Sequence, residues 1–171
     1  TLQTGKEPEK VVEPIIELKE DAYLDGEYIN DATNKIEIYQ RIAAIRTDEH
    51  ADQLEEELID RFGALTEPVK KIMQVARLKN YARKLKIKSI IEKPAFVEIC
   101  FDKAPNIEPE NMLLAKKQFD NLLKFVPKQN TIQIKITPIN KKHIINLCLK
   151  VVKVLTGEKL QKMTLKKEEK K

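Results

Sequence analysis

The hydrophobic pattern of this chain changes after residue 85, and that change constrains the fold more than any single motif does. Over residues 32–85, apolar residues recur at the three-and-four spacing of amphipathic helices. After it, Ile132, Ile134 and Ile136 alternate with Gln133 and Lys135, which is the pattern of a half-buried strand. We therefore expect an α/β chain of the α+β type, in which an N-terminal helical subdomain precedes a small, mainly antiparallel sheet covered by helices.

Three closely connected helices are expected in the first half. The first spans residues 32–45, and the second ends at Phe62, where Gly63 can take the left-handed conformation that closes a helix. The third begins after Thr66, a suitable N-cap, and tolerates Pro68 in its first turn. Apolar residues cover a wide arc of this third helix, which predicts burial against more than one neighbour.

Shorter signals define the remaining elements. A turn at Lys93–Pro94 predicts a β-hairpin, Pro109 is placed to open a helix, and Gly157 offers a cap to the last helix. The expected elements are strands at 15–18, 89–92, 96–101 and 132–136, a helix holding Met112, Leu113, Phe119, Leu122 and Leu123, and a last helix over 144–155.

The chain is long enough for one domain with a real core. We expect residues 1–14 to be a linker-like lead-in, 15–157 the domain, and 158–171 a lysine-rich, disordered tail. No apolar run approaches the ~20 residues of a membrane span. Two isolated cysteines, Cys100 and Cys148, are typical of thiols used as small hydrophobes in a reducing cytosol. A cytoplasmic location is therefore expected, and a monomer is the default expectation for the oligomeric state.

The charge is distributed unevenly along the chain. Residues 1–65 hold 7 Lys+Arg against 17 Asp+Glu, a net charge of −10, whereas residues 66–171 hold 25 against 10, a net charge of +15. Such asymmetry indicates two differently charged surfaces or tails. Carboxylates repel phosphates, so the acidic half argues against the whole domain lying on DNA and favours a basic protein partner.

Catalytic chemistry is not indicated. The four glycines do not cluster into a phosphate-binding loop, and His50 and His143 lie far apart in sequence. Successive carboxylates along an exposed helix lack the burial that separates the pKa values of an acid and a base. We expect no catalytic residue, no cofactor, no metal ion and no enzymatic activity of this chain itself.

The most informative run is residues 57–63, which closes the acidic second helix. Residues three and four apart share a helix face, so Leu58, Ile59 and Phe62 are expected to face a core. The residues expected to share an outer surface are Glu56, Glu57, Asp60 and Arg61. The simplest interpretation is an amphipathic helix with a solvated charged side, and the alternative is a surface that faces a partner.

The neighbouring segments favour the second interpretation. Residues 22–29 and 35–43 precede the run, and Leu65, Pro68 and residues 75–79 follow it. In this order and spacing the set resembles the C-terminal domain of the bacterial transcription-repair coupling factor (Mfd) family, over roughly residues 15–156 and most strongly over 22–85. Three positions depart from the family pattern. Asp25 and Thr66 stand where proline is usual, and Lys86 stands where glycine is usual.

The resemblance implies a non-catalytic regulatory domain of an ATP-dependent DNA translocase that removes stalled RNA polymerase and couples transcription to nucleotide excision repair. In that family the domain docks onto an N-terminal module similar to UvrB, hides the surface that recruits UvrA, and represses the motor. The positions that match the family's docking contact are Glu57, Asp60 and Arg61.

An auxiliary DNA-binding module is the alternative, because the second half is basic. Lys79, Arg83 and Lys84 are the candidate phosphate contacts. Single-strand binding would require interleaved aromatic residues for base stacking, and only Tyr81 lies in this run. Weak, salt-sensitive attraction to phosphates fits this composition, and sequence readout does not.

Overall fold

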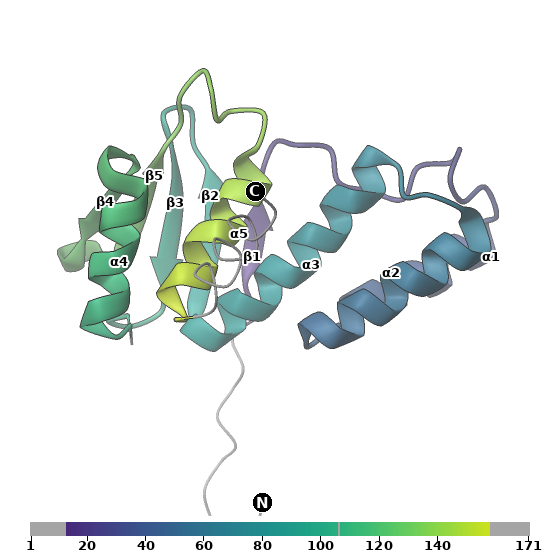
Figure 1. Cartoon of the computed structure of the whole chain (residues 1–171), viewed down its shortest axis with the longest axis horizontal. Coiled ribbons are helices and arrows are strands. Elements are labelled where there is room, and N and C mark those ends of the chain that lie inside the picture. The colour runs from purple at the N-terminus through teal and green to yellow at the C-terminus, as the bar shows by residue number, and fades with distance from the viewer. Residues whose placement is uncertain (1–12, 106, 158–171) are drawn as a thin grey trace, which may run out of the picture.

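The computed structural model describes residues 13–105 and 107–157 and has the expected α+β architecture (Figure 1). The helices are α1 (Ala32–Ala43), α2 (Asp48–Phe62), α3 (Glu67–Leu85), α4 (Pro109–Phe119) and α5 (Ile144–Leu155). The strands are β1 (Ile15–Glu17), β2 (Ile87–Glu92), β3 (Phe96–Phe101), β4 (Leu123–Val126) and β5 (Thr131–Lys135). Short 3-10 turns occupy Asp120–Leu122 and Pro127–Gln129. In this part of the chain, no helix combines the length and apolarity of a membrane span.

The strands form one sheet in the order β1-β2-β3-β5-β4. Its pairs are antiparallel except β1–β2, which is parallel. Ile99 on the central strand pairs with Ile90 on one side and Ile132 on the other, and all three side chains are buried. Helices α4 and α5 lie against one face of this sheet beside the end of α3 (Figure 1). The prediction of a mainly antiparallel sheet covered by helices is therefore confirmed.

Two hydrophobic cores stabilise the molecule, and α3 takes part in both. The first half of α3 gives Val69, Met73 and Ala76 to a core shared with α1 and α2. Its second half gives Leu78 and Leu85, among others, to the core beneath the sheet. The predicted burial of α3 against several neighbours is confirmed, and its continuous backbone connects the helical subdomain to the sheet (Figure 1).

Local capping chemistry sets the ends of α2. The Thr47 hydroxyl accepts a hydrogen bond from the His50 N–H at 3.1 Å, which satisfies one of the free donors at the N-terminus. Gly63 ends the helix at φ +89° and ψ −168°, a region that only glycine adopts without strain. The Tyr28 hydroxyl donates to the Gly63 carbonyl oxygen at 2.7 Å, and burial raises the pKa of this phenol. Tyr28 thus holds the preceding loop on the end of α2.

Two sequence-based expectations are wrong in the region of α4. The helix stops at Phe119 because Asp120 adopts φ +42°, so Leu122 lies in a 3-10 turn. Leu123, also assigned to the helix, instead begins β4, a strand that was not predicted, and pairs with Ile134. The apolar spacing of the helix continues past Phe119 to Leu122 and Leu123. In so short a run, a buried strand residue cannot be distinguished from a buried helix residue by spacing alone.

The three departures from the family pattern have local explanations. Thr66 occupies the N-cap position of α3, but its hydroxyl makes no cap bond and donates instead to the Asp25 carboxylate at 2.7 Å. The two residues that stand in place of prolines thus bond to each other and connect the loop before α1 to the start of α3. Lys86 adopts φ +59° at the end of α3, which explains why glycine suits this position.

Candidate protein-interaction surface

One side of α2 carries a row of exposed polar side chains. Ala51, Leu54 and Leu58 fix the buried side of the helix. The opposite side is defined by residues spaced four, three and four apart, which align along one helix face. We call this row the outer acidic stripe, and it consists of Glu49, Gln53, Glu56 and Asp60, all exposed. Its three carboxylates make no ion pair or hydrogen bond with residues 13–105 or 107–157.

The side of α2 that faces α1 carries a network of paired charges. Arg41 on α1 donates a short hydrogen bond to the Glu57 carboxylate, and Arg61 donates to the same oxygen at 3.1 Å. Arg61 also donates to the Asn34 amide oxygen at 3.3 Å, and its guanidinium lies 4.9 Å from the centre of the Phe62 ring. The hydrogen bond from Arg41 is the main reason why the pKa of Glu57 is lowered.

On the side that faces α3, one arginine pairs with three carboxylates. Arg77, whose side chain is only 15% exposed, lies 2.6 Å from the Asp52 carboxylate and 3.0 Å from that of Glu55. Its other terminal nitrogen lies 3.6 Å from the Asp48 carboxylate. Burial opposes the charged form of Arg77, but these hydrogen bonds outweigh it and raise its pKa. Asp48, Asp52 and Glu55 are therefore already paired with Arg77 within the fold.

The predicted interface residues are thus divided between two sides of α2. Glu56 and Asp60 lie on the outer acidic stripe, whereas Glu57 and Arg61 turn towards α1 and bind each other. Ile59, expected to face a core, is 48% exposed beside the stripe, so that expectation is wrong. Glu49 was missed, although its spacing of seven and eleven residues from Glu56 and Asp60 places it on the same face.

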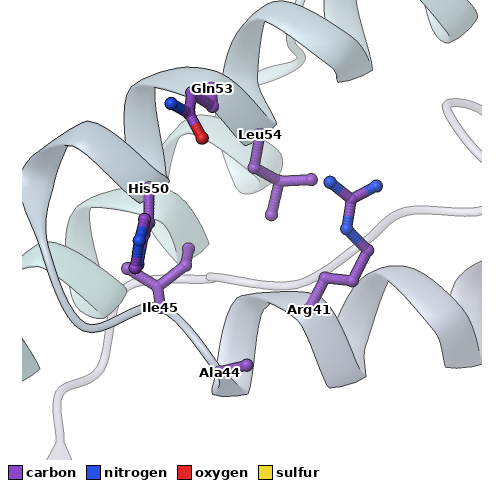
Figure 2. Close-up of a pocket in the computed structure, with 6 residues that line it drawn as sticks. All are labelled: Arg41, Ala44, Ile45, His50, Gln53 and Leu54. Atoms are coloured by element: carbon purple, nitrogen blue, oxygen red, sulfur yellow. The ribbon is translucent and has the colours of Figure 1, made fainter.

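A small pocket adjoins the stripe between α1 and α2 (Figure 2). It has a volume of about 230 Å³, and its lining residues are Arg41, Ala44, Ile45, His50, Gln53 and Leu54. Sites for small organic ligands measure roughly 300–1,000 Å³, so this hollow suits a single side chain better than a cofactor. Gln53 belongs to both features, which makes the pocket continuous with the outer acidic stripe.

The three candidate DNA contacts do not form one surface. Arg83 is only 11% exposed and donates to the Glu13 carboxylate at 2.7 Å and to the Asn80 amide oxygen at 2.9 Å. Lys79 lines the same hollow as Arg83, between α1 and α3. Lys84 lies instead over the ring of Tyr81, 5.1 Å from its centre, on another side of the helix.

Three further residues that could carry chemistry have structural roles instead, namely Tyr81, Cys148 and Cys100. Tyr81 is buried and its hydroxyl donates to the Asp48 carboxylate at 2.7 Å, so its ring offers no platform for a base. Burial raises the pKa of the Cys148 thiol to about 12, which keeps it protonated. Burial also raises the pKa of Cys100, on β3. These groups behave as packing residues rather than as nucleophiles.

Comparisons with known proteins agree on one family. The TRCF domain family matches residues 18–112. The transcription-repair-coupling factor of Escherichia coli (strain K12) is 32% identical over 93 residues, which are 52% of this chain and 8% of that protein. The transcription-repair-coupling factor of Staphylococcus aureus (strain USA300) is 30% identical over 139 residues, which are 80% of this chain and 12% of that protein. The chain therefore corresponds to only a small part of these relatives.

A solved structure supports the same relationship. The crystal structure of the C-terminal domain of a transcription-repair coupling factor superposes with a TM-score of 0.70 at 26% sequence identity. The match covers 86% of this chain and 96% of that one. The similarity therefore extends through the sheet, beyond the residues that the family match covers.

Proposed function

This chain belongs to the TRCF domain family, and we propose that it is a non-catalytic regulatory domain that docks onto a UvrB-like module of its parent protein. Docking would mask the surface with which that module recruits UvrA, and would hold the motor repressed. The parent would be a cytoplasmic, ATP-dependent DNA translocase that acts on stalled RNA polymerase. The proposed partner is thus intramolecular, and UvrA, RNA polymerase and DNA are reached through the parent.

The observation that carries this proposal is the outer acidic stripe. Glu49, Glu56 and Asp60 are held on a rigid helix, exposed, and without a partner among the described residues. Carboxylates in this state form charge-assisted hydrogen bonds to arginines of a partner without first breaking an internal pair. An interface of this kind is polar, and polar interfaces between domains separate readily during a conformational change.

Glu57 and Arg61 would make a second, different contribution. Glu57 already binds Arg41 and Arg61, so an incoming basic residue would have to share the Glu57 carboxylate with them. A carboxylate has about four acceptor positions, so sharing is chemically possible. We therefore expect Arg61 to orient Glu57, and the stripe residues Glu56 and Asp60 to make the direct contacts.

Calorimetry of this chain with the separately produced UvrB-like module tests the proposal. Binding should weaken as salt rises, because exposed charges are screened. The double variant Glu56→Lys with Asp60→Lys should weaken binding by about tenfold or more. Since neither side chain has a partner among the described residues, the urea midpoint of this variant should match that of the unmodified chain.

A control variant with the same change in net charge separates the effect of the outer acidic stripe from the effect of total charge. Asp102→Lys with Glu110→Lys alters two exposed carboxylates in the sheet region and should leave binding within about twofold. Equal losses in both double variants would show a non-specific charge effect and contradict the proposal. Unchanged binding in the stripe variant would remove the stripe from the interface.

A further inference from the structure

We propose that the end of the sheet formed by the β2–β3 and β5–α5 loops contacts the phosphate backbone of duplex DNA. Ile136 N–H donates to the Ala95 carbonyl oxygen at 3.0 Å, so the two loops lie side by side (Figure 1). Four lysines surround this end and define the lysine loop surface, namely Lys93, Lys135, Lys141 and Lys142. This surface is separate from the outer acidic stripe and does not depend on the proposed docking.

The β5–α5 loop is held in one conformation by its own side chains. Thr137 N–H donates to the Asn140 amide oxygen at 2.8 Å, and Asn140 N–H donates back to the Thr137 hydroxyl at 3.1 Å. The Asn140 amide nitrogen also donates to the Lys135 carbonyl oxygen at 3.0 Å. These bonds fix the loop as a turn, so its tip is presented in a defined position without further ordering on binding.

An apolar side chain occupies the tip of this ordered loop. Ile139 is 89% exposed, more than any other large hydrophobic side chain that the structure describes. The Thr137–Asn140 bonds fix the turn that carries this side chain. Isoleucine is among the apolar residues that architectural DNA-binding proteins insert between base steps from the minor groove.

The charges at this end are available to a ligand. No ion pair joins the four lysines to any described carboxylate. Among the carboxylates near this end, Glu20 accepts from the Ile145 N–H at 2.7 Å and pairs with Lys71. Glu92 accepts from the Lys19 N–H at 2.9 Å. Glu20 thus satisfies a free N–H in the first turn of α5, so the positive charge that attracts an anion at this end is that of the lysines rather than of the helix end.

The residue types of the lysine loop surface favour a nucleic-acid phosphate backbone over an acidic protein as its ligand. Protein interfaces are enriched in arginine and aromatic residues and depleted in lysine. The lysine loop surface contains neither an arginine nor an aromatic residue, and no arginine follows Arg83 in the whole chain. Lysine binds phosphates as a point charge, independent of sequence. Without aromatic residues for base stacking, duplex DNA is a better ligand than a single strand.

Fluorescence anisotropy of the 171-residue chain with a short labelled duplex, measured over a series of salt concentrations, tests this inference. Lys141→Glu with Lys142→Glu should weaken binding about tenfold at low salt and reduce the slope of log affinity against log salt by about 2. The matched control is Lys117→Glu with Lys150→Glu, two exposed lysines on α4 and α5, and it should change affinity by less than about twofold.

Two further variants separate the parts of the contact. Ile139→Ala should weaken binding several-fold without changing the salt slope, since it removes no charge. Asn140→Ala should weaken binding by loosening the loop, with every lysine retained. Absence of duplex binding by the unmodified chain, or equal losses in the two lysine pairs, would overturn the inference. Equal competition by polyglutamate of matched charge would assign the surface to an acidic protein instead.

Discussion

The helical subdomain and the sheet region differ in whether their charged side chains form ion pairs. Among the described residues, every ion pair joins side chains between Glu13 and Arg83. All five arginines of the chain lie in that stretch, and each makes at least one hydrogen bond. After residue 86 the cations of the chain are all lysines. None of the ion pairs among the described residues includes a lysine of that stretch.

This difference shows how one small chain can offer two unlike surfaces. A guanidinium has five donors in a fixed plane, so a single arginine such as Arg77 can hold several carboxylates and fix two helices together. The carboxylates left over then form the outer acidic stripe. Lysine carries a strongly hydrated point charge on a flexible stem, so the sheet region presents separate positive charges rather than a network of ion pairs.

The largest expected effect tests whether the two regions fold together. Leu58→Ala in the helical core and Ile99→Ala in the sheet core should each destabilise the chain by about 3 kcal/mol, since both side chains are fully buried. Because α3 belongs to both cores, urea unfolding should remain a single transition in each variant. The control Leu113→Ala, at an exposed position, should cost less than about 0.5 kcal/mol. A plateau with one region unfolded would show that the cores are independent.

The arginine network should be the next most sensitive feature. Arg77→Ala leaves the carboxylates of Asp52 and Glu55 without their cation and should destabilise the chain by about 2 kcal/mol. Arg77→Lys should recover less than half of this, because one ammonium group cannot reproduce the planar fork. Urea denaturation measures both, and Lys117→Ala in the sheet region is the control. Equal stability of the Ala variant and its control would contradict the contrast between regions.

A smaller effect is expected at the junction of the two regions. Lys86 ends α3 at φ +59°, where glycine is unstrained, so Lys86→Gly should stabilise the chain by up to about 1 kcal/mol. The same substitution two residues earlier, Lys84→Gly, lies in the last turn of the helix and should destabilise it by up to about 1 kcal/mol. Thermal unfolding compares the two variants directly. Destabilisation by both would show that contacts of the Lys86 side chain outweigh its backbone conformation.

The smallest expected effect concerns acid stability in the helical subdomain. Arg41 lowers the pKa of Glu57, so the stabilisation from this pair is present at neutral pH and is lost as the pH falls through the lowered pKa. NMR titration of the Glu57 carboxyl carbon should give a midpoint below the usual glutamate range. Arg41→Gln should raise that midpoint. An unchanged midpoint in the variant would assign the shift to Arg61 instead.

Much of the fold could be predicted because local signals agreed with the final packing. Thr47 and Gly63 bound α2 through capping chemistry that acts within a few residues. The strand β4 could not be predicted, because Leu123–Val126 is too short for its period to be recognised and is defined by pairing with β5. Its start depends on the positive φ of Asp120, a residue whose type does not demand that conformation.

The candidate surface was predictable only in part, for a similar reason. Helical spacing identifies Glu56 and Asp60 as outward-facing residues, and the same rule applies to Glu49. It cannot show which carboxylates the fold itself neutralises. Arg41 is sixteen positions from Glu57, and Arg77 is twenty-two positions from Glu55, so both pairings appear only when the helices are packed.

The most direct test of the docking surface is an amide NMR titration of the isotopically labelled chain with the separately produced UvrB-like module. Docking through the outer acidic stripe predicts that the largest shift changes follow Glu49, Gln53, Glu56 and Asp60 along α2. The loops that carry the lysine loop surface should remain unchanged. Changes confined to those loops, or an unperturbed α2 under saturating module, would contradict the assignment of the acidic helix as the docking surface.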